Sequence, residues 1–228
     1  MGPCSKWIVV SSFVLVAACQ AEDSSAPQDP KLEEAAAEHG IPVQVLEAAG
    51  TPRTVDLGDT AAALSDCALE TGTAGEDFAD WTPALDCLAE VQGEIDVHLN
   101  GYGGVQAKAN EISWDDDEVT LTFPIKKSVE GTANCASGSF CFYDGSSYNG
   151  KRLSFRYTVG SARFSTYGMR DKISSWHNHS GALRRVYNEH LRGWDDYILW
   201  VMWGTSGAPT RSSYVGSSDT NKADYFGR

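Results

Sequence analysis

From residue 131 to the end of the chain, short apolar stretches alternate with turn residues. Gly, Ser, Asn and Asp separate these stretches at intervals typical of an all-β sandwich or barrel. Trp176, Trp194, Trp200 and Trp203 also lie in this half, so about a hundred residues contain enough aromatic surface to bury a core. We therefore predict an all-β module, with strands within residues 140–143, 153–157, 173–176, 183–187 and 198–203.

The charge balance of the chain changes near residue 130. Residues 19–130 contain 5 Lys and Arg against 24 Asp and Glu, a net charge of −19, whereas residues 131–228 contain 12 against 7, a net charge of +5. This change indicates a module boundary near residue 130. The basic half has too few clustered Lys and Arg residues for us to expect nucleic-acid binding.

The acidic region, residues 31–130, is predicted to be rich in α-helix. Asp59 is a candidate N-cap, and Pro83 suits the first turn of a later helix in which apolar residues recur at helical spacing. A β-hairpin follows, with the acidic turn 115–117 at its tip. The whole chain is therefore predicted to be α+β, with helices at 31–39, 59–70 and 82–99 and hairpin strands at 112–114 and 119–123.

The first 18 residues have the features of a signal peptide. Lys6 precedes an apolar run at 7–17, which is too short to span a bilayer. The run ends in Val-Ala-Ala-Cys, which resembles a bacterial lipobox and implies that Cys19 is lipidated and anchors the chain to a membrane. The alternative is ordinary cleavage near Ala21, which leaves a secreted protein. Residues 19–30 are polar and rich in Pro and Ser, as expected of a tether.

Four cysteines remain beyond the signal region: Cys67, Cys87, Cys135 and Cys141. An even number in an exported chain predicts two disulfides, for which three connectivities exist. Proximity in sequence favours Cys67 with Cys87 and Cys135 with Cys141, one bond in each half. The spacings do not match those of a redox pair or a zinc site.

One short stretch carries a family signature. Tyr143, Tyr148 and Gly150 follow the spacing aromatic-x4-aromatic-x-Gly, and about twenty residues later comes Arg-Asp-Lys-Ile-Ser-Ser-Trp, with Ser174 and Ser175 near its end. This pattern resembles the Greek-key motif of βγ-crystallins. The resemblance implies a folded hairpin with aromatics beneath it, a glycine where a Cβ would clash, and a serine hydroxyl that holds the hairpin down.

A second, weaker copy of the motif follows. Tyr187 begins an apolar stretch, Gly193 stands where the hairpin glycine is expected, and residues 221–226 align with residues 171–176. An internal repeat of about fifty residues is what two successive Greek keys leave in a sequence. We therefore expect residues 131–228 to form a βγ-crystallin-like double Greek-key sandwich.

The details around the first motif narrow the resemblance. The run from Cys135 through Phe155 to Trp176 looks like that of secreted bacterial peptidase inhibitors built on this fold, whose best-known members are small metalloproteinase inhibitors. The similarity covers about residues 94–228. It implies an exported proteinase inhibitor that presents a rigid, disulfide-braced loop to a secreted proteinase and needs no catalytic residue or cofactor. Candidate loops are residues 144–149 and 204–211.

Two other kinds of function stay open as alternatives. One is a calcium-binding crystallin-like module, with Asp171, Ser174, Asn221 and Asp224 as oxygen ligands, although a cation at position 170 opposes binding there. The other is a purely structural surface lipoprotein. No nucleophile, zinc-peptidase or β-lactamase motif occurs in the chain, so we do not expect an enzyme.

Overall fold

The computed structural model describes residues 30–49, 55–73, 80–125, 133–189, 196–204 and 210–227. The predicted signal peptide, the lipidation site Cys19 and all but the last residue of the tether lie outside these ranges, as does Gly193. None of the helices in the described ranges has both the length and the apolar character needed to cross a bilayer.

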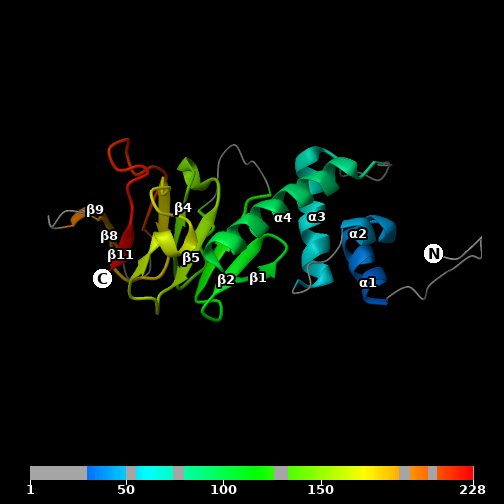
Figure 1. Ribbon diagram of the computed structural model, residues 1–228, viewed down its shortest axis with the longest axis horizontal. Coiled ribbons are helices and arrows are strands. Elements are labelled where there is room, and N and C mark those ends of the chain that lie inside the picture. Colours follow the sequence, from blue (N-terminus) through cyan, green and yellow to red (C-terminus); the bar gives the residue numbers. More distant parts are fainter. Residues whose placement is uncertain are drawn as a thin grey trace, which may run out of the picture.

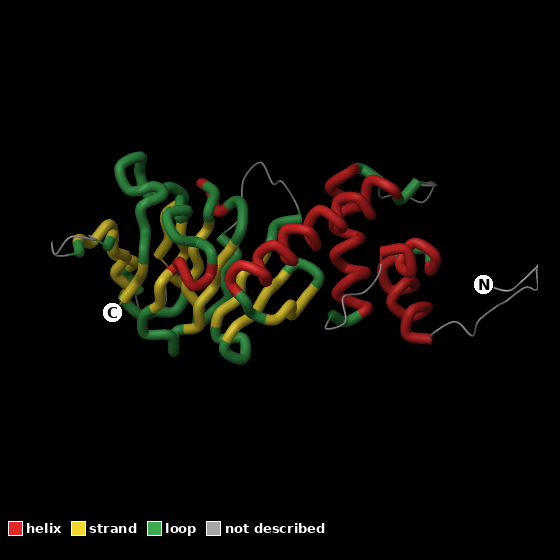
Figure 2. Tube along the Cα trace, viewed as in Figure 1, coloured by secondary structure: helices red, strands yellow, loops and turns green. Residues whose placement is uncertain are grey.

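The N-terminal part of the chain is helical and the C-terminal part is built from antiparallel strands, so the predicted α+β class is confirmed (Figure 2). One predicted detail is wrong. Asp56 caps the third helix and accepts a hydrogen bond of 2.8 Å from the Gly58 N–H, whereas Asp59 lies inside the first turn. The helix starts earlier because Leu57 packs against the helical core. The helices are α1 (Pro30–His39), α2 (Val43–Ala49), α3 (Leu57–Thr71) and α4 (Thr82–Tyr102).

Helix α4 contributes to the two larger hydrophobic clusters of the described residues. Ala84 and Leu88, near its start, pack with α1–α3, and Val91 and Ile95 pack with the strands. A disulfide between Cys67 and Cys87 joins α4 to α3. In Figure 1 the helix runs from the bundle at one end of the molecule to the β-rich part at the other.

Two antiparallel sheets make up the β-rich part. The seven-stranded sheet has the order β1-β2-β3-β5-β4-β7-β10, and the four-stranded sheet has the order β6-β11-β8-β9. Short 3-10 turns, η1 and η2, connect some of the strands. The bounds are β1 (Val105–Lys108), β2 (Glu111–Trp114), β3 (Val119–Thr122), β4 (Ser139–Tyr143), η1 (Ser146–Tyr148), β5 (Arg152–Arg156), β6 (Ala162–Arg163), η2 (Phe164–Tyr167), β7 (Ser175–Asn178), β8 (Arg184–Asn188), β9 (Tyr197–Met202), β10 (Thr210–Ser212) and β11 (Tyr225–Gly227).

Phenylalanine rings fill the space between the two sheets. Phe226 of β11 meets Phe155 of β5 with ring centroids 4.7 Å apart and Phe140 of β4 at 4.8 Å, both edge to face. All three side chains are fully buried. Edge-to-face contacts of this kind stabilise the core beyond the area they bury.

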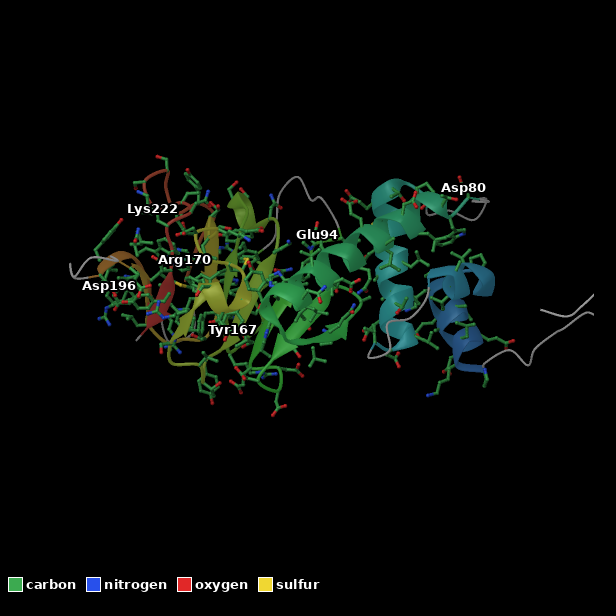
Figure 3. The ribbon with its side chains drawn as sticks, in the orientation of Figure 1. Asp80, Glu94, Tyr167, Arg170, Asp196 and Lys222 are labelled. Atoms are coloured by element: carbon green, nitrogen blue, oxygen red, sulfur yellow. A yellow bond between two sulfur atoms is a disulfide. The ribbon has the colours of Figure 1, made fainter. Side chains whose placement is uncertain are left out.

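The seven-stranded sheet continues across the change of charge near residue 130. Strand β3 pairs with β5, and Leu121 lies directly opposite Leu153. The second half of α4, which carries Glu94, is also attached to the β-rich part, where Tyr167 lies (Figure 3). His98 Nε2 lies 3.0 Å from the Tyr167 carbonyl oxygen of η2. Glu94 forms an ion pair of 2.9 Å with Lys151, which directly precedes β5. The charge boundary is therefore not the end of a sheet or of a core.

This continuity predicts that residues 131–228 do not fold alone. Removing β3 leaves one edge of β5 unpaired and uncovers Leu153 and Phe155, which are 0% exposed in the whole chain. We expect no cooperative thermal transition by circular dichroism. A fragment of residues 80–228 with Cys87→Ser keeps α4 and β1–β3 and should unfold cooperatively. A cooperative transition of residues 131–228 near the midpoint of the full chain would contradict this.

Candidate functional site

The candidate site is the turn between β4 and β5, residues 144–150. Asp144 Oδ1 accepts a hydrogen bond of 2.7 Å from the Lys151 N–H, which closes the turn. Gly150 has φ +76°, and a Cβ there would lie 1.9 Å from that same carboxylate oxygen. Only glycine suits this position, as the motif implies. Burial raises the pKa of Asp144, whereas the hydrogen bond from Lys151 opposes this shift.

The Ser175 side chain fastens this turn onto the sheet. Its hydroxyl donates to the Gly145 carbonyl oxygen at 2.7 Å and accepts from the Tyr148 N–H at 3.1 Å. Ser175 is 0% exposed and lies opposite Tyr143 in the pairing of β7 with β4. One hydroxyl therefore satisfies a donor and an acceptor of the turn's backbone.

The tip of the turn has an unusual backbone. Ser147 and Tyr148 both lie in the left-handed region, with φ values of 54° and 62°. Non-glycine residues adopt this conformation at a cost, so the surroundings must hold it in place. Besides Ser175, the Ser213 carbonyl oxygen does so by accepting from the Ser147 N–H at 2.6 Å.

A disulfide and two tyrosines brace the turn from below. Cys135 and Cys141 are bonded, with Cα atoms 5.7 Å apart, and they pack with Tyr143 and Tyr148. The two tyrosine rings meet edge to face at 5.6 Å. The Tyr143 hydroxyl donates to Asn134 Oδ1 at 3.2 Å, and burial raises the pKa of Tyr143 to about 12. The structure thus contains both disulfides that sequence proximity favours.

Ser174 has a different place from Ser175. Its backbone N–H donates to the Tyr143 carbonyl oxygen at 2.8 Å, and its carbonyl oxygen accepts from the Val215 N–H at 3.0 Å. These are backbone bonds that any residue can make, so the serine pair is not equivalent in the structure.

The second candidate loop, residues 204–211, lies mostly outside the described residues. Its last part enters β10, which pairs with β7 and places Arg211 opposite His177. The structure therefore brings the end of this loop to the same sheet edge as the strand that holds the turn.

Two of the four residues considered for calcium, Asp171 and Asp224, lie beside a cation of the protein itself. Arg170 Nε lies 2.5 Å from Asp224 Oδ1 and 3.6 Å from Asp171 Oδ2 (Figure 3). Asp224 is 4% exposed, and its other oxygen accepts a hydrogen bond of 2.6 Å from the Glu189 N–H. Burial and the charge of Asp224 raise the pKa of Asp171, against the effect of Arg170. Both oxygens of the buried carboxylate already have partners.

The two aligned motif segments lie against each other. Asp171 and Asn221, at equivalent positions, both have left-handed backbones with φ values of 56° and 59°. The Asp171 N–H donates to the Ala223 carbonyl oxygen at 3.0 Å, and the Asn221 N–H donates to that of Ile173 at 3.3 Å. In the described ranges, no three or more His, Cys, Asp or Glu side chains are grouped so that they suit a metal ion.

Sequence reasoning missed some residues that hold the site. Asn134 accepts a hydrogen bond from the Tyr143 hydroxyl at the end of β4, and the Ser213 carbonyl oxygen accepts one from the Ser147 N–H. Asp144 lies in the expected loop 144–149, but nothing in the sequence indicates that its carboxylate closes the turn by accepting from the Lys151 N–H. Asn134 and Ser213 lie in polar, irregular segments that have no recognisable spacing.

Comparison with known proteins assigns part of this region to a family. Residues 129–191 match the model of peptidase inhibitor family I36. The matched segment contains β4 through β8, including the turn 144–150, the Cys135 to Cys141 disulfide and Ser175. No curated protein and no solved structure matches the chain.

The role of Ser175 predicts a difference between neighbouring serines. Ser175→Ala leaves the Tyr148 N–H and the Gly145 carbonyl without their partner, and we expect the free energy of unfolding to fall by about 1–3 kcal/mol. Ser174→Ala is the matched control and should cost less than about 0.5 kcal/mol. Urea unfolding measures both. Equal losses would show that the hydroxyl of Ser175 is not what holds the turn.

The Arg170 ion pair predicts a second stability difference. Arg170→Gln removes the cation from a buried carboxylate and should lower the free energy of unfolding by about 1–3 kcal/mol. The control is Arg163→Gln, which breaks an exposed pair with Glu189 and should cost less than about 1 kcal/mol.

Calcium melts of the same two proteins test the metal alternative. We expect millimolar calcium to leave the wild-type melting temperature unchanged, because Arg170 is already paired with the Asp224 carboxylate and its positive charge repels the ion. In Arg170→Gln, calcium should restore part of the lost stability, since the freed carboxylates are hard oxygen ligands. A calcium-dependent rise in the wild-type protein would favour the calcium-binding alternative.

Proposed function

Because residues 129–191 form a segment of peptidase inhibitor family I36, we propose that the protein is an exported proteinase inhibitor that presents the turn 144–149 to a proteinase cleft. The match to this family is the observation that carries the proposal. The target class, a secreted metalloproteinase, rests on the resemblance of the first motif to small inhibitors of such enzymes. Lipidation at Cys19 would hold the inhibitor at a membrane, and cleavage near Ala21 would release it.

The rigidity of the turn supports this role. A loop that is already ordered loses little conformational entropy when it binds, so more of the contact energy appears as affinity. The turn is held from three sides, by Ser175 on β7, by the Ser213 carbonyl and by the packing of Tyr148 on the disulfide. Ser146, at its outer edge, is exposed.

The position of the turn also suits a partner of large size. It joins β4 to β5, which lie in the β-rich half, whereas α1–α3 lie at the other end of the molecule (Figure 1). The helical core takes no residue from β4 or β5. The acidic bundle is therefore a spacer in this proposal and not a cover over the turn.

An inhibitor of this kind needs no catalytic group and no cofactor. Asp144, the carboxylate of the turn, is bonded to the backbone of Lys151, and Ser175 is bonded to the backbone of the turn on both sides. These groups hold a conformation, which is consistent with a protein that acts by binding.

Substituting the exposed serine of the turn tests where the proteinase binds. Ser146→Glu places a charged side chain at the outer edge and should weaken inhibition at least tenfold, about 1.4 kcal/mol of binding free energy, with the melting temperature unchanged. Ser165→Glu is the matched control, since this serine is also exposed and lies in the other 3-10 turn, η2. The inhibition constant of residues 20–228 is measured against a panel that includes a thermolysin-like zinc proteinase.

The two parts of the proposal fail in different ways. If the wild-type protein inhibits no member of a broad panel at micromolar concentration, the inhibitor function is wrong. If it inhibits, and both glutamate variants inhibit equally well, the function stands and another surface contacts the enzyme.

A further inference from the structure

His177, in β7, is buried, and its ring makes no well-formed hydrogen bond within the described part of the chain. Its side chain is 4% exposed, and neither ring nitrogen has a hydrogen-bond partner among the residues that the structure describes. The Ala133 backbone contacts the ring and favours its protonated form, but burial and the charges of His179 and Arg211 outweigh this contact and lower the pKa of His177. Buried polar groups are nearly always paired, and an unpaired imidazole is cheapest to bury in its neutral form.

A second histidine connects His177 to the disulfide. The ring of His179 stacks on that of His177, with centroids 5.3 Å apart and an interplanar angle of 17°. His179 Nδ1 lies 2.9 Å from the Cys135 carbonyl oxygen. His177 also lies directly opposite Cys141, the partner of Cys135, in the pairing of β7 with β4. The two histidines, one in β7 and one directly after it, therefore lie against the segment 133–135.

The groups facing the pair do not offset an added positive charge. Strand β10 places Arg211 opposite His177, and strand β4 supplies the oxidised Cys141. The segment at residues 133–135 contributes Asn134 and Cys135, neither of which carries a charge. From β5, the neighbour of β4 on the far side, Ser154 contacts Cys141 Sγ. None of the described groups acting on His177 is a carboxylate.

The same strand holds the proposed binding turn. Ser175 and His177 are two residues apart on β7, so their side chains project from the same face of the sheet. Ser175 bonds the turn through Tyr148 and Gly145, and β7 pairs with β4 through both positions. A disturbance at His177 therefore acts on the strand that fixes the turn.

We propose that His177, stacked on His179, is an acid-sensitive lock, which keeps the turn 144–150 and the disulfide segment in place while the His177 ring is neutral and loosens them when that ring is protonated. A proton on His177 puts a charge with no counter-ion among the described residues in a buried position opposite Arg211. The lock is a property of the folded chain and does not depend on the proposed inhibition. If the protein does inhibit a proteinase through this turn, acid weakens that complex.

The direction of the pH effect follows from the same surroundings. Burial first, and then the charges of His179 and Arg211, lower the pKa of His177 from 6.5 to about 4. Between these values the unfolded chain binds a proton that the folded chain does not, so stability is full above pH 6.5 and falls as the pH drops toward 4. Over that range the unfolding equilibrium constant rises by up to about 300-fold, the ratio that corresponds to about 2.5 pH units.

The test uses residues 20–228 with both disulfides intact. Urea unfolding from pH 7.5 to pH 3.5 is compared for wild type and His177→Phe, which keeps a buried ring and removes the titrating group. Burial also lowers the pKa of His98, which contributes a pH dependence of the same sign to both wild type and His177→Phe. The difference between the two proteins therefore isolates the contribution of His177. His39→Gln, a histidine of α1, is the control and should keep the wild-type slope.

A local measurement separates the lock from a general loss of stability. The Tyr148 amide, bonded to Ser175, should lose hydrogen-exchange protection at pH 4.5 in wild type, relative to the Ile95 amide of α4, and keep it in His177→Phe. Should that variant not fold, an NMR titration of the His177 ring in wild type decides instead. A His177 pKa near 6.5, or an unchanged pH slope in His177→Phe, overturns the proposal.

Discussion

The attachment of other segments to strand β7 is the constraint on which the β-rich part depends. On its inner face, Asn178 is 0% exposed and donates to the Met202 carbonyl oxygen at 3.1 Å, which ties the seven-stranded sheet to the four-stranded sheet. On its outer face, Ser175 holds the turn and His177 lies under the disulfide segment. One strand of four residues therefore fixes the relation of both sheets to the candidate site. Because Ser175 and Asn178 are both fully buried, their hydrogen bonds are formed where an unpaired polar atom costs most.

Segments on both sides of residues 129–191 complete the sheet and the core of the matched family segment. Residues 129–191 end before β9, β10 and β11, yet β10 pairs with β7 and Phe226 of β11 lies in the aromatic core. On the other side, β3 pairs with β5, and α4 adds Val91 and Ile95 to the same core. The matched segment is thus the centre of a larger fold. Helix α4 makes that fold continuous with the acidic bundle, because its first half is built into the helical core.

Charge is handled differently at Asp224 and at His177, two of the buried ionisable residues. Asp224 is buried with a cation: Arg170 forms an ion pair with its Oδ1, and the Glu189 N–H donates a hydrogen bond to its Oδ2. His177 is buried with no counter-ion among the described residues and with a cation, Arg211, opposite it. The first arrangement is stable at neutral pH because opposite charges are paired, and the second is stable because the ring is uncharged.

Much of this fold was predictable from local pattern. The strands at 140–143 and 153–157, the hairpin at 112–123 and the pairing of the four cysteines by proximity all agree with the structure, because alternating apolar residues, turn residues and short loops act within a few positions of the chain. Gly150 was predictable for the same reason, since the residue that excludes a Cβ there is Asp144 in the same turn. The predicted N-cap of α3, Asp59, lies three residues after the observed N-cap, Asp56, because the packing of Leu57 extends the helix.

By itself, then, the sequence determined the α+β class, the position of the folded turn and the family of the segment around it. Only the tertiary structure decided that β3 belongs to the same sheet as that segment and that α4 belongs to the same core. The change in charge near residue 130 suggested a boundary there, but the backbone hydrogen bonds that join strands do not depend on the charge of the segments. It also decided that Ser175, and not Ser174, binds the turn, and that His177 has no polar partner among the described residues. These outcomes depend on which residues meet across the sheet, and such contacts are set by the packing of segments far apart in the chain.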